Sequence, residues 1–281
     1  MKERPEETTP LPAPVVDSHC HLDVTDRHLG DTLDPVQALA LAREAGITRV
    51  VQVGCDVTSS QWAADFAAGR DDVVAAVALH PNEVPRLVER GGQGALDEAL
   101  GVIETLAQRD DVRAVGETGL DYYRTREAEA QAVQHDSFRR HIDLAKRFDR
   151  TLVIHDRDAH DDILRILAEE GAPDRVVFHC FSGDAAMARY CADQGWWCSF
   201  AGVVTYKNAE DLREALRVLP RESILVETDA PYLTPVPHRG KVNASYLIPH
   251  TVRAMAEVRE VAVQELCQDM WDNSQRAFGE W

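Results

Sequence analysis

The sequence predicts an α/β protein with the (β/α)8 architecture of a TIM barrel, in a single domain. Short apolar runs rich in Val and Ile recur along the chain, and amphipathic stretches with apolar residues at helical spacing separate them. Strands that alternate with helices form βαβ units and a parallel sheet. Eight such units favour a closed barrel over an open sheet. The chain has 281 residues, enough for one barrel of about 250 residues.

The expected strands are apolar without alternation, which is typical of parallel strands that are buried on both faces. They are 15–18, 50–53, 73–78, 112–115, 152–154, 176–178, 197–200 and 224–226. The expected helices are 35–45, 96–108, 127–148, 158–170, 185–194, 212–219, 249–258 and 263–278. Several of them end at a Gly or Pro. The stretch 91–94 is expected to be a loop before a helix, and no linker to a second domain is apparent.

The composition, with 44% hydrophobic and 28% charged residues, is that of a soluble globular protein. Residues 1–14 are polar, acidic and rich in proline and lack the apolar run of a secretory signal. We therefore expect a flexible N-terminal tail over 1–14, a barrel over 15–281 and a cytoplasmic location. No stretch approaches the roughly 18 apolar residues of a membrane helix. The six cysteines form no CxxC pair, which favours reduced thiols over disulfides.

Two histidines lie at the end of the first predicted strand, in the segment Asp17-Ser18-His19-Cys20-His21. Residues two apart on a strand point to the same face, so His19 and His21 can present two imidazoles to one metal ion. Such a pair also arises by chance on polar loops. Its place at a strand end favours function, because barrel enzymes carry their chemistry at the C-terminal ends of the strands.

Further potential metal ligands follow four other predicted strands. Glu117 comes directly after the fourth strand, His155 and His179 follow the fifth and sixth, and Asp229 lies just beyond the eighth. A carboxylate buried alone is costly, and a nearby cation offsets that cost. Six nitrogen and oxygen ligands exceed the need of one tetrahedral zinc. They suffice for two divalent ions that share Glu117 as a bridge, with Mg, Mn or Zn all possible.

With these residues in place, the chain resembles the TatD family of metal-dependent deoxyribonucleases, within the amidohydrolase superfamily. The segments that carry the resemblance are DSHCHLD, GETGLDYY, VIHDRDA, HCFSG and ETDAPYL, which span residues 17 to 233. The resemblance implies that His19, His21, Glu117, His155, His179 and Asp229 are the metal ligands. It further implies that Asp229 and Glu117 are catalytic.

The resemblance also suggests substrate contacts from His80, Arg239 and Lys241. His80 matches a histidine of the third strand that lies near the substrate phosphate in the family. The family usually has a second His where this chain has Asn82. Arg239-Gly240-Lys241 resembles a basic loop after the eighth strand, but here Asn243-Ala244-Ser245 replaces the usual Asn-Glu-Pro. An ordinary solvated loop explains Arg239 and Lys241 equally well.

The expected reaction is hydrolysis of phosphodiester bonds in DNA, and the resemblance implies 3′-to-5′ trimming of single strands. No membrane or obligate protein partner is indicated. The formal net charge of −18 argues against a broad nucleic-acid-binding face. An enzyme that acts on strand ends needs only a small positive site, which bound cations provide. Two alternatives remain open: an amidohydrolase-type enzyme for a small amide, ester or lactone, and a scaffold protein with an inactive barrel.

Overall fold

The computed structural model describes residues 5, 8–24 and 33–280. Its eight strands belong to one sheet in which they follow sequence order from β1 to β8. Every strand pairing that the structure defines is parallel. Parallel neighbours in sequence order, joined by helices, are the topology of a (β/α)8 barrel. The predicted fold class is therefore confirmed.

The chain divides into two compact units, the first made of 1–52 with 180–281 and the second of Val53–His179. The first contains β1 (Val15–Cys20), α1 (Pro35–Glu44), β2 (Ile47–Val53), α6 (Ala185–Asp193), β7 (Trp197–Phe200), α7 (Glu210–Val218), β8 (Ile224–Val226), α8 (Ile248–Arg259) and α9 (Val263–Phe278). β1 pairs with β2, and β7 pairs with β8. Beyond β8, an isolated parallel bridge joins Ala230 to Cys20 at the end of β1.

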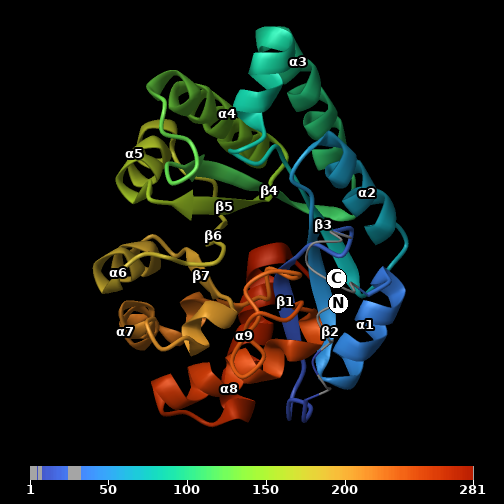
Figure 1. Ribbon diagram of the computed structural model, residues 1–281, viewed down its shortest axis with the longest axis vertical. Coiled ribbons are helices and arrows are strands. Elements are labelled where there is room, and N and C mark those ends of the chain that lie inside the picture. Colours follow the sequence, from blue (N-terminus) through green and yellow to red (C-terminus); the bar gives the residue numbers. More distant parts are fainter. Residues whose placement is uncertain (1–4, 6–7, 25–32, 281) are drawn as a thin grey trace. The chain divides into compact units, whose positions relative to one another are not determined.

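The second unit contains α2 (Val57–Ala67), β3 (Val73–Val77), α3 (Val84–Ala107), β4 (Val112–Asp121), α4 (Ala128–Arg147), β5 (Thr151–Arg157), α5 (His160–Glu170) and β6 (Val176–Phe178). Its four strands pair in the order β3, β4, β5, β6. α3 and α4 lie side by side beyond these strands (Figure 1). The apolar side chains of β3 are all buried, as expected for a strand covered on both faces.

Two expected features differ from the structure. The loop predicted over 91–94 is wrong, because α3 already begins at Val84 and continues through this stretch with a break at Gly92, where φ is 70°. α2 has no counterpart among the expected helices; it begins with a capping box in which Asp56 and Ser59 satisfy each other's backbone N–H groups. The predicted tail 1–14 lies partly outside the described residues, while Leu11 is buried and donates its N–H to Ala45.

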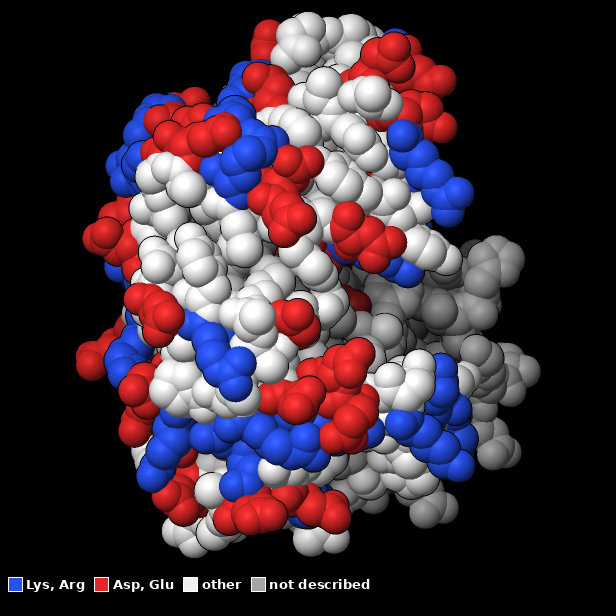
Figure 2. Space-filling model, turned by 90° about the vertical axis from the view of Figure 1, so that its left-hand side faces the viewer, with Lys and Arg blue, Asp and Glu red and all other residues white. Residues whose placement is uncertain are grey.

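The charged side chains of the surface are mixed in sign. On α4 and α5, Arg139 pairs with Glu169 and Glu170, and Arg165 pairs with Asp162. Positive and negative side chains lie interspersed over most of the face drawn in Figure 2. Within the described ranges, no helix combines the length and the apolar character that a membrane span requires.

Candidate metal centre

The first unit brings His19, His21 and Asp229 together. The Nε2 atoms of the two histidines lie 3.2 Å apart. Oδ1 of Asp229 lies 3.3 Å from Nε2 of His21 and 3.9 Å from Nε2 of His19. His19 is fully buried, and the Asp229 side chain is 17% exposed. Two imidazole nitrogens and one carboxylate oxygen thus converge at the edge of the interior.

Backbone hydrogen bonds to β1 hold Asp229 in this position. Its N–H donates to the carbonyl of His19 at 2.9 Å, and the N–H of His21 donates to the carbonyl of Ala230 at 2.8 Å. Asp229 has a left-handed φ of 52°, a conformation that Asp adopts more readily than most residues. The backbone of the segment Asp229-Ala230-Pro231 therefore helps to position the Asp229 carboxylate beside the two histidines.

Asp17 ties β1 to the segments that carry Asp229 and the pocket described below. Its carboxylate accepts hydrogen bonds from the N–H and hydroxyl of Thr228, at 3.0 and 2.6 Å, and from the hydroxyl of Ser245 at 2.7 Å. It also accepts from the N–H of His19. Burial raises the pKa of Asp17 to about 7, and the hydrogen bonds from Thr228 and Ser245 partly oppose that rise.

The second unit places three imidazoles around the carboxylate of Glu117. Its Oε1 lies 2.6 Å from Nδ1 of His155, 2.8 Å from Nε2 of His179 and 3.3 Å from Nε2 of His80. Burial by itself raises the pKa of Glu117, but the charges and hydrogen bonds of the imidazoles, led by His179 and His80, outweigh it and hold the pKa well below its usual range. An ionised carboxylate is therefore present among ring nitrogens inside the protein.

Glu117 and His155 lie within their strands rather than after them, which corrects the sequence-based expectation. β4 continues to Asp121 and β5 continues to Arg157. His155 pairs in register with Gly119, whose φ is 139° and whose position leaves no room for a side chain. A Cβ atom there would lie 2.1 Å from the carbonyl oxygen of His155. The glycine thus permits the close approach of the strands that brings Glu117 and His155 together.

Sequence reasoning missed Asp121, a buried residue at the end of β4. Its Oδ2 lies 3.3 Å from Nε2 of His155 and accepts a hydrogen bond from Nδ2 of Asn82 at 2.8 Å. Burial lowers the pKa of His155, but the hydrogen bonds that its ring donates to Asp121 and Glu117 outweigh the burial, so the net shift is upward. The alternation of residues 117, 119 and 121 along one strand could have indicated a shared face.

The hydrogen bonds of His80 distinguish it from a metal ligand. Its Nδ1 accepts a hydrogen bond from the backbone N–H of Asn82 at 3.0 Å, so the neutral ring carries its proton on Nε2, the atom that faces Glu117. A metal ligand must offer an unprotonated nitrogen. Burial is the main cause that lowers the pKa of His80 and keeps the ring neutral. The side chain is thus arranged as a hydrogen-bond donor through Nε2.

Arg239 and Lys241 lie on the loop after β8, and Cys55 lies beside Glu117. The guanidinium of Arg239, on the loop after β8, lies 4.2 Å from the ring centroid of Tyr206, and the backbone around Lys241 is fixed by the hydroxyl of Thr234, which donates to its carbonyl. In the second unit, Sγ of Cys55 lies 3.7 Å from Oε2 of Glu117. Nothing in the sequence around Cys55 indicated this position.

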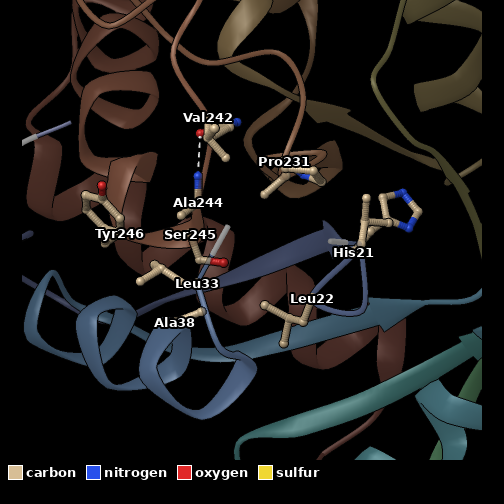
Figure 3. A pocket seen from close by; sticks show the side chains of 12 residues that line it. His21, Leu22, Leu33, Ala38, Pro231, Val242, Ala244, Ser245 and Tyr246 are labelled. Carbon is tan, nitrogen blue, oxygen red and sulfur yellow. Dashed lines mark hydrogen bonds between the residues drawn. The ribbon is translucent and has the colours of Figure 1, made fainter. Parts of the chain in front are cut away.

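A pocket opens beside His21 in the first unit, with about 470 Å³ of open space that includes solvent. His21 stands at one end of it and Tyr246 at the other (Figure 3). The walls are mostly apolar, from Leu22 and Ala38 on one side and Val242 on the other. The pocket therefore offers an apolar surface next to one of the candidate ligands.

The family model described as TatD related DNase matches residues 16–279. The chain belongs to the TatD family. Among its relatives, an uncharacterized metal-dependent hydrolase TatD of Mycobacterium tuberculosis is 45% identical, with 94% of this chain and 98% of that protein aligned. The metal-dependent hydrolase YcfH of Escherichia coli K12 is 40% identical over 94% and 95% of the two chains. The structure of the TatD homologue YjjV of Escherichia coli K12 has a TM-score of 0.83 at 26% identity, with 94% and 97% covered.

This TatD-family chain is a metal-dependent hydrolase, and its donor chemistry fits a divalent cation. His80, Glu117 and His155 each offer an atom within 4.8 Å of the others. With Nε2 of His80 protonated, Glu117, His155 and His179 are the candidate donors of the second unit. His19, His21 and Asp229 are the candidate donors of the first. Imidazole nitrogen with carboxylate oxygen suits Zn and Mn, and carboxylates suit Mg.

Proposed function

We propose that this TatD-family hydrolase cleaves phosphodiester bonds of DNA and trims single strands from the 3′ end. The observation that carries the proposal is the buried carboxyl group of Glu117 with three imidazoles within 3.3 Å of one oxygen. A charged carboxylate in the interior is costly unless a cation or several donors face it. The name of the matching family, TatD related DNase, supports DNA as the substrate.

The proposed cofactors are two divalent cations, Mg, Mn or Zn, held by His19, His21, Glu117, His155, His179 and Asp229. When bound, such ions neutralise charge on phosphate oxygens and make water more acidic. Glu117 would hold a cation together with His155 and His179, whose ring nitrogens lie 2.6 and 2.8 Å from its Oε1. Asp121 orients His155 through Nε2, so that Nδ1 faces Glu117.

The chain's own residues supply the proton transfer and the contacts with phosphate. Asp229 acts as the general base and accepts the proton of the attacking water on its carboxylate. The Nε2–H of His80 donates a hydrogen bond to a phosphate oxygen. Arg239 and Lys241 stabilise the charge that develops on the other oxygens. The guanidinium of Arg239 lies over the ring of Tyr206, a contact at an exposed site that is worth roughly 0.5–1 kcal/mol.

The test is a hydrolysis assay on single-stranded DNA labelled at either end, with added Mn or with a chelator. We expect metal-dependent loss of nucleotides from the 3′ end, so that a 5′ label reports a ladder of shortened products. Metal analysis of the purified protein accompanies the assay. Equal amounts of product with Mn and with chelator would contradict metal dependence. A ladder seen only with the 3′ label, which reports loss of nucleotides from the 5′ end, would contradict the proposed direction.

A second candidate, hydrolysis of a small amide, ester or lactone, is favoured by the pocket beside His21. Its mostly apolar walls suit a compact organic group better than a phosphate. The same assay series distinguishes the two, because bis(p-nitrophenyl) phosphate reports phosphodiester cleavage and p-nitrophenyl acetate reports ester cleavage. Metal-dependent turnover of the acetate alone would favour the second candidate.

A further inference from the structure

Beyond the Glu117 cluster, the ends of β4 and β5 carry an exposed group of aromatic and basic side chains. We call Tyr123, Arg124, Arg126 and Arg157 the Tyr123 surface. The first three follow β4 directly in the chain, and Arg157 is the last residue of β5, in register with Asp121. All four are exposed, and Tyr123 retains 52% of its accessible surface. An aromatic ring this open, at the end of the strands that carry the site, is available for a ligand.

Arg157 holds the ring of Tyr123 in place. Its guanidinium lies 4.0 Å from the ring centroid, within the range of a cation–π contact. One face of the ring thus meets a planar cation, which orients the side chain without burying it. A flat ring with a fixed orientation is the arrangement on which a nucleic-acid base stacks.

The three arginines of the Tyr123 surface retain their positive charge unpaired within the described part of the chain. Among residues 5, 8–24 and 33–280, no carboxylate forms an ion pair with Arg124, Arg126 or Arg157, although the chain has a net charge of −18. Of the adjacent carboxylates, Glu127 accepts from the backbone N–H of Arg126, and Asp158 is exposed. Guanidinium groups bind phosphate with well-defined geometry.

We propose that the Tyr123 surface binds the single-stranded nucleic acid adjacent to the bond that is cleaved, with a base on Tyr123 and phosphates on the arginines. This inference rests on the proposed function and names the part of the substrate held outside the metal centre. Arg157 lies two residues beyond His155, about 7 Å along an extended strand. A strand with one phosphate at His155 would therefore lay its neighbouring nucleotides over this surface. Paired bases in a duplex cannot stack on the ring, so single strands are preferred.

The test measures binding of a fluorescent oligothymidylate by anisotropy in the presence of a chelator, so that turnover does not enter. Tyr123→Ala is expected to weaken the affinity roughly tenfold, and Tyr123→Phe, which keeps the ring, to bind like the wild type. On an abasic oligomer of the same length the Tyr123→Ala effect should disappear. Arg124→Ala should weaken both probes and reduce the slope of log K against log salt by about 0.7.

Arg90→Ala is the matched control, because Arg90 is an exposed arginine on α3 in the same unit. It should leave affinity and salt slope unchanged. The inference is overturned if Tyr123→Ala binds oligothymidylate like the wild type, or weakens the abasic oligomer equally. It is also overturned if Arg90→Ala costs as much as Arg124→Ala. If the wild type binds as expected but does not cleave DNA in Mn, the proposed function fails while this surface stands.

Discussion

Glu117 shows how its neighbours decide the charge of a buried carboxyl group. Burial favours the protonated form, while His179, His80 and His155 favour the ionised form and outweigh the burial. The negative charge is thus available at neutral pH without a change in protonation. In turn, the three imidazoles need the charged carboxylate as a hydrogen-bond acceptor, so a neutral side chain at position 117 would weaken the hydrogen bonds of all three.

Glu117→Gln is expected to reduce the bound metal and the hydrolytic activity by more than the roughly 10–100-fold typical of losing an outer partner of a ligand. The amide keeps the size of the side chain but removes its charge and adds two N–H groups that face ring nitrogens. Metal analysis and turnover of a phosphodiester are the measurements. Glu104→Gln, which alters a surface carboxylate paired with Arg147, is the control. A Glu117→Gln protein with normal metal content would contradict the role assigned to Glu117.

Asp121→Asn tests a positioning residue. Its Oδ2 accepts from His155 and from Asn82, and its Oδ1 accepts from the backbone N–H of Arg124. An amide in its place can accept with only one of its two atoms, so it cannot keep all three bonds. We expect a 10–100-fold loss of metal affinity, with activity restored at high metal concentration. Asp156→Asn, on the same strand as His155 but hydrogen-bonded to His160, should retain the affinity. Loss of activity that excess metal does not restore would argue against a positioning role.

At the scale of elements, the approach of β4 to β5 depends on Gly119. A methyl group at this position would meet the carbonyl of His155 at 2.1 Å, with φ at 139° in a region that side chains avoid. Gly119→Ala is therefore expected to lower the free energy of unfolding by at least about 2 kcal/mol, measured by urea titration. Gly101→Ala in α3, where a Cβ atom meets nothing within 4 Å, should be neutral or stabilising. Equal stability of the two variants would contradict this account.

A buried histidine joins α4 to the segment after β3. The Nε2 of His141 accepts from the N–H of Leu79 at 3.1 Å, and its Nδ1 lies 2.7 Å from the carbonyl of Ser137, to which it donates. The ring is thus neutral with its proton on Nδ1. Burial lowers the pKa of His141 from 6.5 to about 4.

Stability is accordingly expected to fall as the pH falls from 6.5 to 4. Over that window the unfolded chain binds a proton at this ring and the folded chain does not, so the unfolded state is favoured by on the order of 3 kcal/mol at the acidic end. His141→Gln should be less stable at neutral pH but should show a shallower dependence over the same window, measured by urea titration at each pH. An unchanged slope in the variant would assign the effect to other groups.

For the molecule as a whole, the net charge of −18 limits the affinity of its surface for nucleic acids. Positive and negative side chains are mixed on the face shown in Figure 2, and duplex binding needs many phosphate contacts at once. We expect weak binding to long duplex DNA at physiological salt, measured by anisotropy with a chelator present. Tight duplex binding without metal would contradict this expectation.

The sequence predicted the strands well, because buried parallel strands are apolar runs: β6, β7 and β8 match the expected ranges to the residue. The predicted strand 112–115 was shorter than β4, because Glu117, Gly119 and Asp121 interrupt the apolar pattern that is typical of a buried strand. Their conformation depends on pairing with β5, which is a tertiary effect. The hydrogen bonds of Asp121 to Asn82 and His155 were equally unpredictable, because they join residues 39 and 34 positions apart. The sequence predicted which side chains could bind a metal, but it did not predict the tautomers of the histidines or their hydrogen-bond partners.

Because the chain is synthesised from its N-terminus, the two ligand clusters can form at different stages of translation. The three imidazoles within 3.3 Å of Oε1 of Glu117 belong, like Glu117 itself, to the continuous stretch Val53–His179, and so have left the ribosome once that stretch has emerged. His19 and His21 emerge earlier still, but the partners that fix their strand, Thr228, Asp229 and Ser245, come more than 200 residues later. A nascent chain that stalls before residue 228 therefore carries an incomplete first cluster. The histidines that are translated first are the ones whose surroundings are finished last.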